Sequence, residues 1–295
     1  MDIHQLKSLV TVARCGTVAR AAELLHLSQP AISAHIKSLE EELRIRLFDR
    51  HAKGMSLTPA GETVFAHARN ALRAVEAIRD EANSLAGDLH GELVIGTVND
   101  PVFLRLPAFL REMREIAPDL SISLVQTTSG GVLKNIADGV FDAGFVEGKL
   151  ADGQWDATLL AKVSFRIGYP TAWRDRLGDG SLSAALALPW IGTSEDCSFS
   201  LLTRSLFEEQ GRTFSPAIRT DQDALLLDLV AQEAGLSLLR SDLIASYASP
   251  LVSVLDGVTI DAGIHFVSSL NPAKPGLLRL ANRAVRRAWP VRPAD

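Results

Sequence analysis

Hydrophobic residues recur at helical spacing between residues 28 and 44 and predict a helix with one apolar face. The apolar stripe, with steps of four, three and four residues, consists of Ile32, Ile36, Leu39 and Leu43. Ser28 precedes this helix, where its hydroxyl can accept a free backbone N–H. Pro30 falls in the first turn, where the missing N–H of proline has no cost. The pattern therefore predicts that the helix begins just after Ser28.

A second, shorter helix is predicted at residues 18–25, directly upstream. Thr17 caps it, and only His26 and Leu27 separate it from Ser28. Two short helices joined by a tight turn are typical of a helix-turn-helix, the motif that fits the major groove of DNA. Periodicity alone also permits an ordinary helical hairpin inside a core, so both interpretations stay open at this point.

The face of the later helix opposite its apolar stripe is polar and carries no large hydrophobic side chain. In a helix-turn-helix this face contacts the bases. The candidate DNA-contacting residues on it are Ser28, Gln29, Pro30, Ser33, Ala34 and Lys37. Ala34 is too short to reach a guanine and can touch only a thymine methyl group, so direct base reading depends on its neighbours.

A long helix is predicted after Thr58 and Pro59, ending near residues 87–91. Its apolar residues form a heptad seam at Val64, Ala68, Ala71, Val75, Ile78, Ala82 and Leu85. A helix buried in the chain's own core is the competing interpretation, but the other faces are polar. Because a seam needs a partner helix, we expect two chains to pair. Pairing would set two recognition helices one DNA turn, or a multiple, apart, which predicts an imperfect palindrome in double-stranded DNA.

From Glu92 onward, short apolar runs alternate with helical periodicity. Strands are predicted at residues 93–97, 121–125, 142–146, 165–169, 190–192, 236–239, 251–255 and 265–268. Helices are predicted at residues 101–116, 131–139, 199–210, 222–234 and 276–288. This alternation predicts a parallel sheet covered by helices on both faces.

A long ordered run of residues resembles one family of DNA-binding proteins. The run AAELLHLSQPAISAHIKSLEEEL, followed by LFDR and SLTPAG, is similar to the amino-terminal domain of the LysR-type transcriptional regulators. The resemblance implies an α+β multidomain protein: a winged helix-turn-helix at residues 1–58, a linker and dimerisation helix at 59–90, and an effector-binding domain at 91–295. It also implies a wing around Gly54, in which Arg50 and Lys53 meet DNA phosphates.

The same resemblance implies that the effector-binding domain consists of two α/β subdomains, as in a periplasmic binding protein. Subdomain I is expected at residues 92–162 and 266–295, and subdomain II at 163–265. The family further implies a homodimer or a homotetramer. A small-molecule effector then binds between the subdomains and changes the spacing of the DNA-binding pairs.

In open α/β sheets, ligands bind at the carboxyl ends of strands, next to helix amino-termini. That rule selects the effector-binding candidates Asn99, Asp100, Thr128, Ser129, Glu147, Thr193, Cys197, Ser198 and Phe199. Backbone amides at residues 129–132 and 198–200 would suit an anionic group, so the expected effector is a carboxylate or a zwitterion. Acidic residues nearby favour a ligand that also carries an amine, although Asp100 is equally suited to capping the helix it precedes.

Composition narrows the remaining classes of function. The chain has 295 residues and a net charge of −5, of which residues 1–60 carry +2 and the remainder −7. We expect no membrane span, because no run of about 18 apolar residues occurs. With only Cys15 and Cys197, a reducing cytoplasm is expected. The scattered histidines lack metal-ligand spacing, and no catalytic constellation is visible, so we expect no metal, no cofactor and no enzymatic activity.

Two other interpretations remain beside an effector-responsive regulator. One is a constitutive DNA-binding regulator with a vestigial cleft, and the other is a ligand-binding protein without DNA function. The missing signal peptide and the added first ninety residues weigh against the second.

Overall fold

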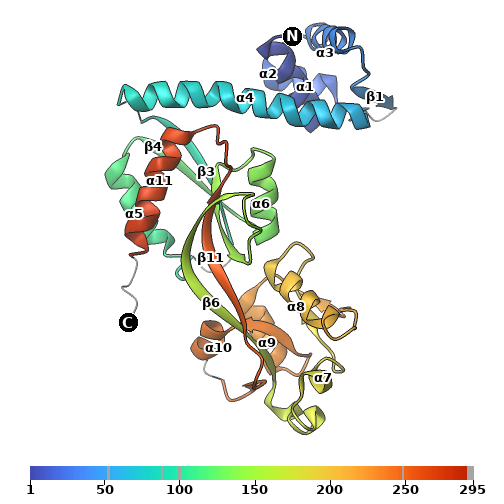
Figure 1. The fold of residues 1–295 in the computed structure, drawn as a ribbon, viewed down its shortest axis with the longest axis vertical. Helices are drawn as coiled ribbons and strands as arrows, with labels where there is room; N and C mark the ends of the chain where they lie inside the picture. The colour runs from blue at the N-terminus through green and yellow to red at the C-terminus, as the bar shows by residue number, and fades with distance from the viewer. Residues whose placement is uncertain (52–53, 88, 99–100, 248, 291–295) are drawn as a thin grey trace. The chain divides into compact units, whose positions relative to one another are not determined.

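The computed structural model describes residues 1–51, 54–87, 89–98, 101–247 and 249–290 (Figure 1). Its backbone divides into two compact units. The N-terminal unit comprises residues 1–88 together with 271–276, and the C-terminal unit comprises residues 89–270 and 277–295. No helix within the described residues is long and apolar enough to cross a membrane.

The N-terminal unit contains the predicted helix pair and a small hairpin. Its elements are α1 (Ile3–Cys15), α2 (Val18–Leu25), α3 (Gln29–Leu43), β1 (Phe48–His51), β2 (Gly54–Leu57) and α4 (Pro59–Leu85). The Thr17, Ser28 and Thr58 side chains each accept a backbone N–H at the start of a helix, as predicted. The helix-turn-helix, with His26 in the left-handed region at the end of α2, is therefore confirmed as local structure.

A single hydrophobic core holds these elements together. Ile32 and Leu39 of α3 are fully buried against Leu9 and Val12 of α1, so the predicted apolar stripe faces inward. Polar side chains fix the same two helices: the Gln5 amide donates to the Ser38 hydroxyl at 3.0 Å. The opposite face of α3 is thereby held outward.

Helix α4 has two halves with different surroundings. In the first half, Ala68 is buried in the N-terminal core and Val64 packs against it. These two seam positions are therefore used within the chain, in line with the competing interpretation of a core helix. In the second half, Ile78 is 70% exposed and Leu85 is 83% exposed. The apolar seam is open only from about Ala71 onward.

The C-terminal unit is built on a mixed sheet, which corrects the expectation of a parallel one. Strands β3 (Gly91–Thr97), β4 (Leu120–Gln126) and β5 (Ala143–Gly148) are parallel. The long strands β6 (Asp156–Pro170) and β11 (Ile260–Ser268) run antiparallel, and β11 joins the sheet beside β5. The strand order is β10-β6-β11-β5-β3-β4, with β9 paired to β6. The first half of β6 escaped prediction.

Helices cover the sheet in two lobes that β6 and β11 connect. In the first lobe, α5 (Leu106–Ile116) and α11 (Pro275–Ala288) pack on one face and α6 (Ser129–Ala137) on the other. The second lobe contains α8 (Ser198–Glu208), α9 (Asp223–Ala231) and α10 (Ser241–Tyr247), with the strands β9 (Ser237–Arg240) and β10 (Val252–Val254). Helix α5 begins at Leu106, five residues later than predicted, because residues 101–105 form turns.

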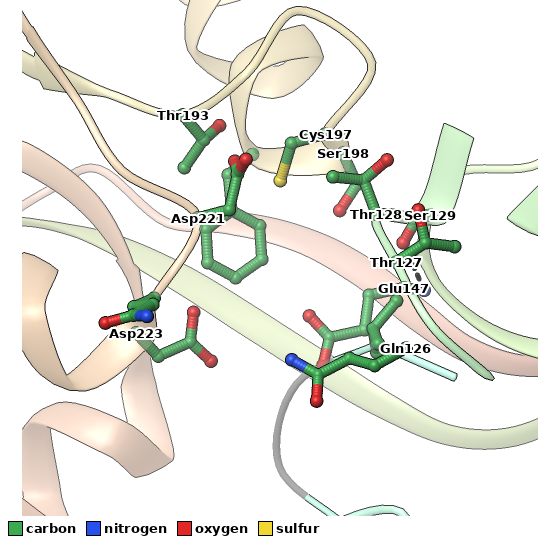
Figure 2. A pocket seen from close by; sticks show the side chains of 13 residues that line it. Gln126, Thr127, Thr128, Ser129, Glu147, Thr193, Cys197, Ser198, Asp221 and Asp223 are labelled. Carbon is green, nitrogen blue, oxygen red and sulfur yellow. Dashed lines mark hydrogen bonds between the residues drawn. The ribbon is translucent and has the colours of Figure 1, made fainter. Parts of the chain in front are cut away.

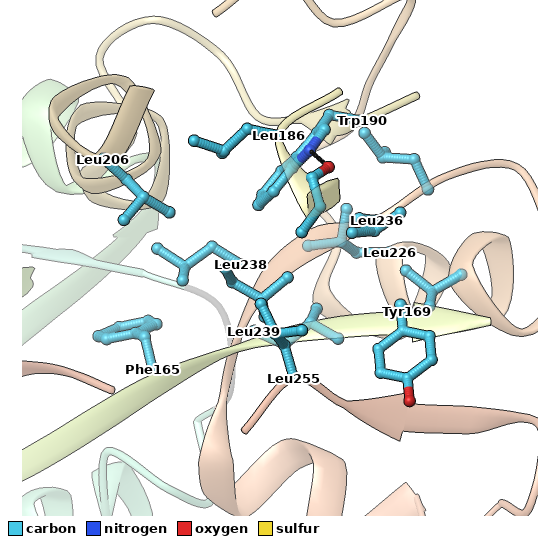
Figure 3. Close-up of a cluster of buried hydrophobic side chains, with 14 of the residues drawn as sticks. Phe165, Tyr169, Leu186, Trp190, Leu206, Leu226, Leu236, Leu238, Leu239 and Leu255 are labelled. Atoms are coloured by element: carbon cyan, nitrogen blue, oxygen red, sulfur yellow. Dashed lines mark hydrogen bonds between the residues drawn. The ribbon is translucent and has the colours of Figure 1, made fainter. Parts of the chain in front are cut away.

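Each lobe has its own hydrophobic core. The second-lobe core lies around Phe165, Leu238 and Trp190, whose indole donates to the Ala185 carbonyl at 3.0 Å (Figure 3). Short elements of this lobe were not predicted: η1 (Thr171–Trp173), η2 (Asp175–Leu177), α7 (Leu182–Ala185) and β8 (Ile218–Arg219), which pairs with β7 (Ile191–Gly192). Two cores joined by two long strands leave a junction between the lobes.

Candidate functional site

The first candidate site is the outward face of α3. Gln29, Pro30, Ala34 and Lys37 are exposed, Ser33 is half-buried, and Ser28 caps the helix with its hydroxyl accepting the Ala31 N–H at 3.3 Å. All six sequence candidates therefore share one surface. The amino-terminal turn of α3 presents polar side chains that nothing in its own core uses.

A groove of about 250 Å³ separates α3 from the β1–β2 hairpin. Ser33, Ala34, Lys37 and Arg50 line it, which brings candidates from helix and hairpin together. Arg46 lines the same groove and was missed, because the sequence treats it as the end of a helix. Lys53 lies outside the described residues. The groove thus carries three cationic side chains next to the recognition helix.

Backbone contacts hold the hairpin against the helices. One carboxylate oxygen of Glu40 on α3 accepts the N–H groups of Leu47 at 2.7 Å and Phe48 at 3.3 Å. The Met55 N–H donates to the Gly16 carbonyl at 2.7 Å. Gly54 has a φ of +140°, and a Cβ there would clash with the Gly16 carbonyl oxygen. The hairpin is therefore fixed at both strands.

The second candidate site is a pocket of about 320 Å³ at the junction of the two lobes (Figure 2). Seven sequence candidates line it: Thr128, Ser129, Glu147, Thr193, Cys197, Ser198 and Phe199. Asn99 and Asp100 lie outside the described residues. Val98 and Thr127, which also line the pocket, belong to loops that the strand-end rule selects, whereas the lining residues Gln126, Asp221, Gln222 and Asp223 were missed. The strand-end rule therefore found the first half of the pocket wall better than the second.

The lobes touch each other beside the pocket. The Gly130 N–H donates to the Asp196 carbonyl at 2.9 Å, and the Thr128 hydroxyl donates to the Asp196 carboxylate at 2.9 Å. A Cβ at position 130 would clash with the Asp196 carbonyl oxygen, so only glycine permits this approach. The contact links the start of α6 to the loop that precedes α8.

These contacts correct the expectation of free amides at residues 129–132. The N–H of Gly130 is used by Asp196, that of Gly131 donates to the Thr128 hydroxyl at 3.0 Å, and that of Val132 donates to the Thr128 carbonyl. Thr128 and Asp196 thus cap the α6 amino-terminus. Less donor capacity for an anion remains there than the sequence indicated.

One wall of the pocket is acidic. Glu147 is 6% exposed, and its carboxylate accepts a hydrogen bond from Arg240 at 2.6 Å. The fully buried Arg240 also pairs with Asp242 at 2.6 Å and lies 3.6 Å from the centre of the Phe103 ring. Burial raises the pKa of Glu147 to about 7, and Asp223 adds to the rise while Arg240 opposes it. Glu147 therefore titrates near neutral pH.

The opposite wall contains Thr193, Cys197 and Asp221. Burial raises the pKa of the Cys197 thiol, so it is a poor nucleophile at neutral pH. Thr193 is 4% exposed, and its hydroxyl is buried. Among the described residues, the hydroxyl has no hydrogen-bond partner apart from the neighbouring Cys197 thiol. The Asp221 carboxylate accepts the Ser194 N–H at 2.8 Å, which fixes its position.

Comparisons with known proteins now give both sites a context. Residues 3–62 match the model of the bacterial regulatory helix-turn-helix protein, lysR family, and residues 86–288 match that of the LysR substrate binding domain. The chain is 35% identical over 190 residues to the HTH-type transcriptional regulator TfdT of Cupriavidus pinatubonensis, covering 64% of this chain and 76% of TfdT. It spans about half the length of several other curated relatives.

Solved structures share the fold over nearly the whole chain. A full-length single-residue variant of OxyR from Pseudomonas aeruginosa aligns with a TM-score of 0.68 and 20% identity, covering 100% of this chain and 99% of OxyR. CbnR complexed with its target DNA aligns with a TM-score of 0.55 and 23% identity, covering 98% and 100%. Both family models fit, and together they cover both units. The chain therefore belongs to the LysR family of DNA-binding transcriptional regulators with effector-binding domains.

Proposed function

We propose that α3 reads the DNA, that α4 pairs two chains, and that a small molecule in the lobe-junction pocket controls how the pairs bind. The observation that carries the proposal is the outward face of α3. A core supports this face from behind, its side chains Gln29, Pro30 and Ala34 are exposed, and the exposed Lys37 ammonium pairs with Glu41 of the same helix at 3.5 Å. A regulator of this family needs such a face to meet base edges.

Within the proposed DNA site, phosphate contacts and base contacts are divided. Arg46, Arg50 and Lys37 line the groove beside the hairpin and are suited to phosphates, as is Lys53 from the sequence alone. Gln29 and Ser33 are suited to hydrogen bonds with base edges, and the Ala34 methyl to a thymine methyl group. The positive charge is modest, so base contacts and pairing must carry much of the specificity.

The open part of the α4 seam is the proposed pairing surface. Ile78 and Leu85 are large apolar side chains that are mostly exposed in the single chain. Burying them against a partner helix would release water from both surfaces. The resulting two-fold arrangement implies an imperfect palindrome, and a second pairing of dimers would give a tetramer.

The proposed effector is a small carboxylate or zwitterion bound at the lobe junction. The amino-terminus of α8 at Ser198 is suited to an anionic group, although the Phe199 and Ser200 amides already contact the Cys197 sulfur. The neighbouring contacts of Asp196 with Thr128 and Gly130 join the two lobes. A ligand that prefers one arrangement of the lobes would shift its population and, through it, the DNA-binding pairs.

A mobility shift assay with the DNA upstream of the protein's own gene tests the DNA half. The full chain is expected to retard this duplex more strongly than a random duplex at moderate salt. Gln29→Ala should abolish the preference, whereas Gln210→Ala, an exposed glutamine in the C-terminal unit, should keep it. Equal retardation of both duplexes by the unchanged protein would refute the proposal.

Two further experiments address pairing and the effector. Ile78→Glu should produce monomers in sedimentation at micromolar concentration, while Asn83→Glu, which adds the same charge on another face of α4, should not.

A thermal-shift screen of metabolites should find a stabilising ligand, since saturation at a hundred times Kd adds about 2.7 kcal/mol. A wholly blank screen would favour a constitutive regulator.

A further inference from the structure

The lining of the lobe-junction pocket has an uneven charge. Its ionisable side chains that bear charge are the carboxylates of Glu147, Asp221 and Asp223, and no lysine, arginine or histidine occurs among its described lining residues. Figure 2 shows the Glu147 and Asp223 side chains turned into the pocket, with the Gln126 amide beside Glu147. A cationic group in the pocket would therefore meet attraction from several sides.

The buried Arg240 does not balance this charge. It donates to Glu147 at 2.6 Å and to both carboxylate oxygens of Asp242 at 2.6 and 3.1 Å. One guanidinium thus faces two carboxylates before Asp223 is considered. Arg240 is not part of the pocket lining, so its positive charge faces Glu147 and Asp242 and not the inside of the pocket. The wall itself keeps an excess of negative charge.

A second feature of the pocket also indicates a polar ligand. The Thr193 hydroxyl lines the pocket, is buried, and has only the Cys197 thiol as a neighbouring partner among the described residues. A buried hydroxyl normally finds a stronger partner than a thiol. A ligand oxygen in the pocket would supply one, and the start of α8 lies on the same side. Asp221 lies there too, but one oxygen of its carboxylate already accepts the Ser194 N–H at 2.8 Å and the Ser194 hydroxyl at 2.9 Å.

We propose that the pocket selects a small zwitterion: its protonated amine lies between Glu147 and Asp223, and its anionic end reaches Thr193 and the start of α8. The inference rests on the proposal that this pocket binds the effector and names the chemistry of that ligand. A simple carboxylate lacks the group that the acidic wall attracts. The amine, rather than the carboxylate, is therefore the feature that decides specificity.

Binding of the amine is linked to a proton. Burial raises the pKa of Glu147 to about 7, and the charged groups that face this carboxyl are Arg240 on β9, Asp223 on α9 and Asp242 on α10. An ammonium favours the ionised carboxylate, so binding expels the proton that the empty pocket partly holds. The affinity for an amine should rise as the pH is raised through about 7, whereas hexanoate should bind no better at higher pH.

The test uses a matched set of probes that share a six-carbon chain: L-norleucine, 6-aminohexanoate and hexanoate, together with the twenty L-amino acids. Binding to the full chain is measured by calorimetry. At least one amine-bearing probe should bind about 10-fold more tightly than its des-amino counterpart. Glu147→Gln and Asp223→Asn should each remove that preference, and Glu147→Gln should also remove the pH dependence. Glu208→Gln, an exposed carboxyl at the end of α8, should change neither.

The outcomes separate this inference from the proposal beneath it. If hexanoate binds as tightly as the amines, or if both pocket variants keep the preference for an amine, the zwitterion inference is wrong while the effector pocket stands. If no amine binds but the wider metabolite screen finds a ligand, the inference is again overturned alone. Only a blank result in both removes the effector proposal as well. Far-ultraviolet circular dichroism of each variant checks that it is folded. If Glu147→Gln does not fold, Asp223→Asn still tests the preference for an amine.

Discussion

The two candidate sites of this regulator are built in opposite ways. The proposed DNA-binding face consists of neighbouring residues on α3, with Arg46 and Arg50 close by in the chain, and its groove is lined by three cationic side chains and one carboxylate. The pocket is assembled from residues between Val98 and Asp223, and the charged side chains that line it are carboxylates. One site is local and basic, and the other is non-local and acidic. The net charge of −5 for the whole chain indicates neither site.

Each site keeps its geometry by different means. The α3 face needs only a capped helix and a core behind it, so a short stretch of sequence contains nearly all the information. The pocket needs two lobes in contact and a buried ion pair, Glu147 with Arg240, whose members are 93 residues apart. Changes should therefore act on stability in the pocket and on affinity in the DNA site.

The largest expected effect follows from removing the buried guanidinium. Arg240→Met leaves Glu147 and Asp242 without their partner, and losing one member of a buried ion pair costs about 3–5 kcal/mol. Urea unfolding monitored by tryptophan fluorescence, with all four tryptophans in the C-terminal unit, measures the loss. Arg166→Met is the control: Arg166 is half-buried, but its 3.5 Å pair is with the fully exposed Asp256, so losing that pair should cost less than about 1 kcal/mol. Equal losses would contradict the role of burial.

The next effect is a pH dependence of stability that originates at Glu147. Its pKa is about 7 in the folded protein and 4.5 in the ordinary state, so the folded chain holds a proton that the unfolded chain has released. The contribution of this group to stability should fall as pH rises from about 4.5 to 7 and stay constant above, by about 3 kcal/mol at most. Denaturant unfolding at several pH values tests this, because Glu147→Gln should flatten the curve of unfolding free energy against pH. A Glu208→Gln variant with the same flattening would remove Glu147 as its source.

Most of the local structure was predictable because its signals are local. The caps at Thr17, Ser28 and Thr58 predicted the starts of three N-terminal helices to the residue, whereas α4 ends at Leu85, before the expected residues 87–91. The sheet was less predictable. The first half of β6 shows only weak alternation of apolar and polar residues. Its partner strand, β11, lies far along the chain, with Asp156 opposite Ser268, and their antiparallel pairing makes the sheet mixed. In α4, burial of Ala68 depends on how the helix packs on α1, which periodicity does not specify.

The pocket was predictable only where one rule applied. Thr128, Ser129 and Thr193 follow strands and precede helices, and the strand-end rule found them. Asp221 and Asp223 follow β8, whose two residues, Ile218 and Arg219, are both exposed, so no buried apolar run marks that strand in the sequence. Arg240 occupies a strand, where a charged residue suggests an exposed edge. Only the tertiary pairing with Glu147 shows that it is buried.

A smaller effect is expected at the basic groove beside α3. Lys37→Ala and Arg50→Ala should each weaken DNA binding similarly for all sequences and lower the slope of log K against log salt by about one, because each removes about one phosphate contact. Fluorescence anisotropy measures this slope when binding is titrated at salt concentrations between about 50 and 200 mM. Lys7→Ala, an exposed lysine on α1, should leave the slope unchanged. An unchanged slope in both groove variants would place the phosphates elsewhere.

One dissociation constant decides whether the outward face of α3 is the surface that reads DNA. The duplex from upstream of the gene is titrated with a Gln29→Ala, Lys37→Ala double variant and with a Gln210→Ala, Lys7→Ala double variant, which removes the same groups from other exposed positions. We expect Kd to rise at least about 10-fold for the first double variant and to stay within about twofold of the unchanged protein for the second. Equal Kd values for the two double variants would contradict that role of α3.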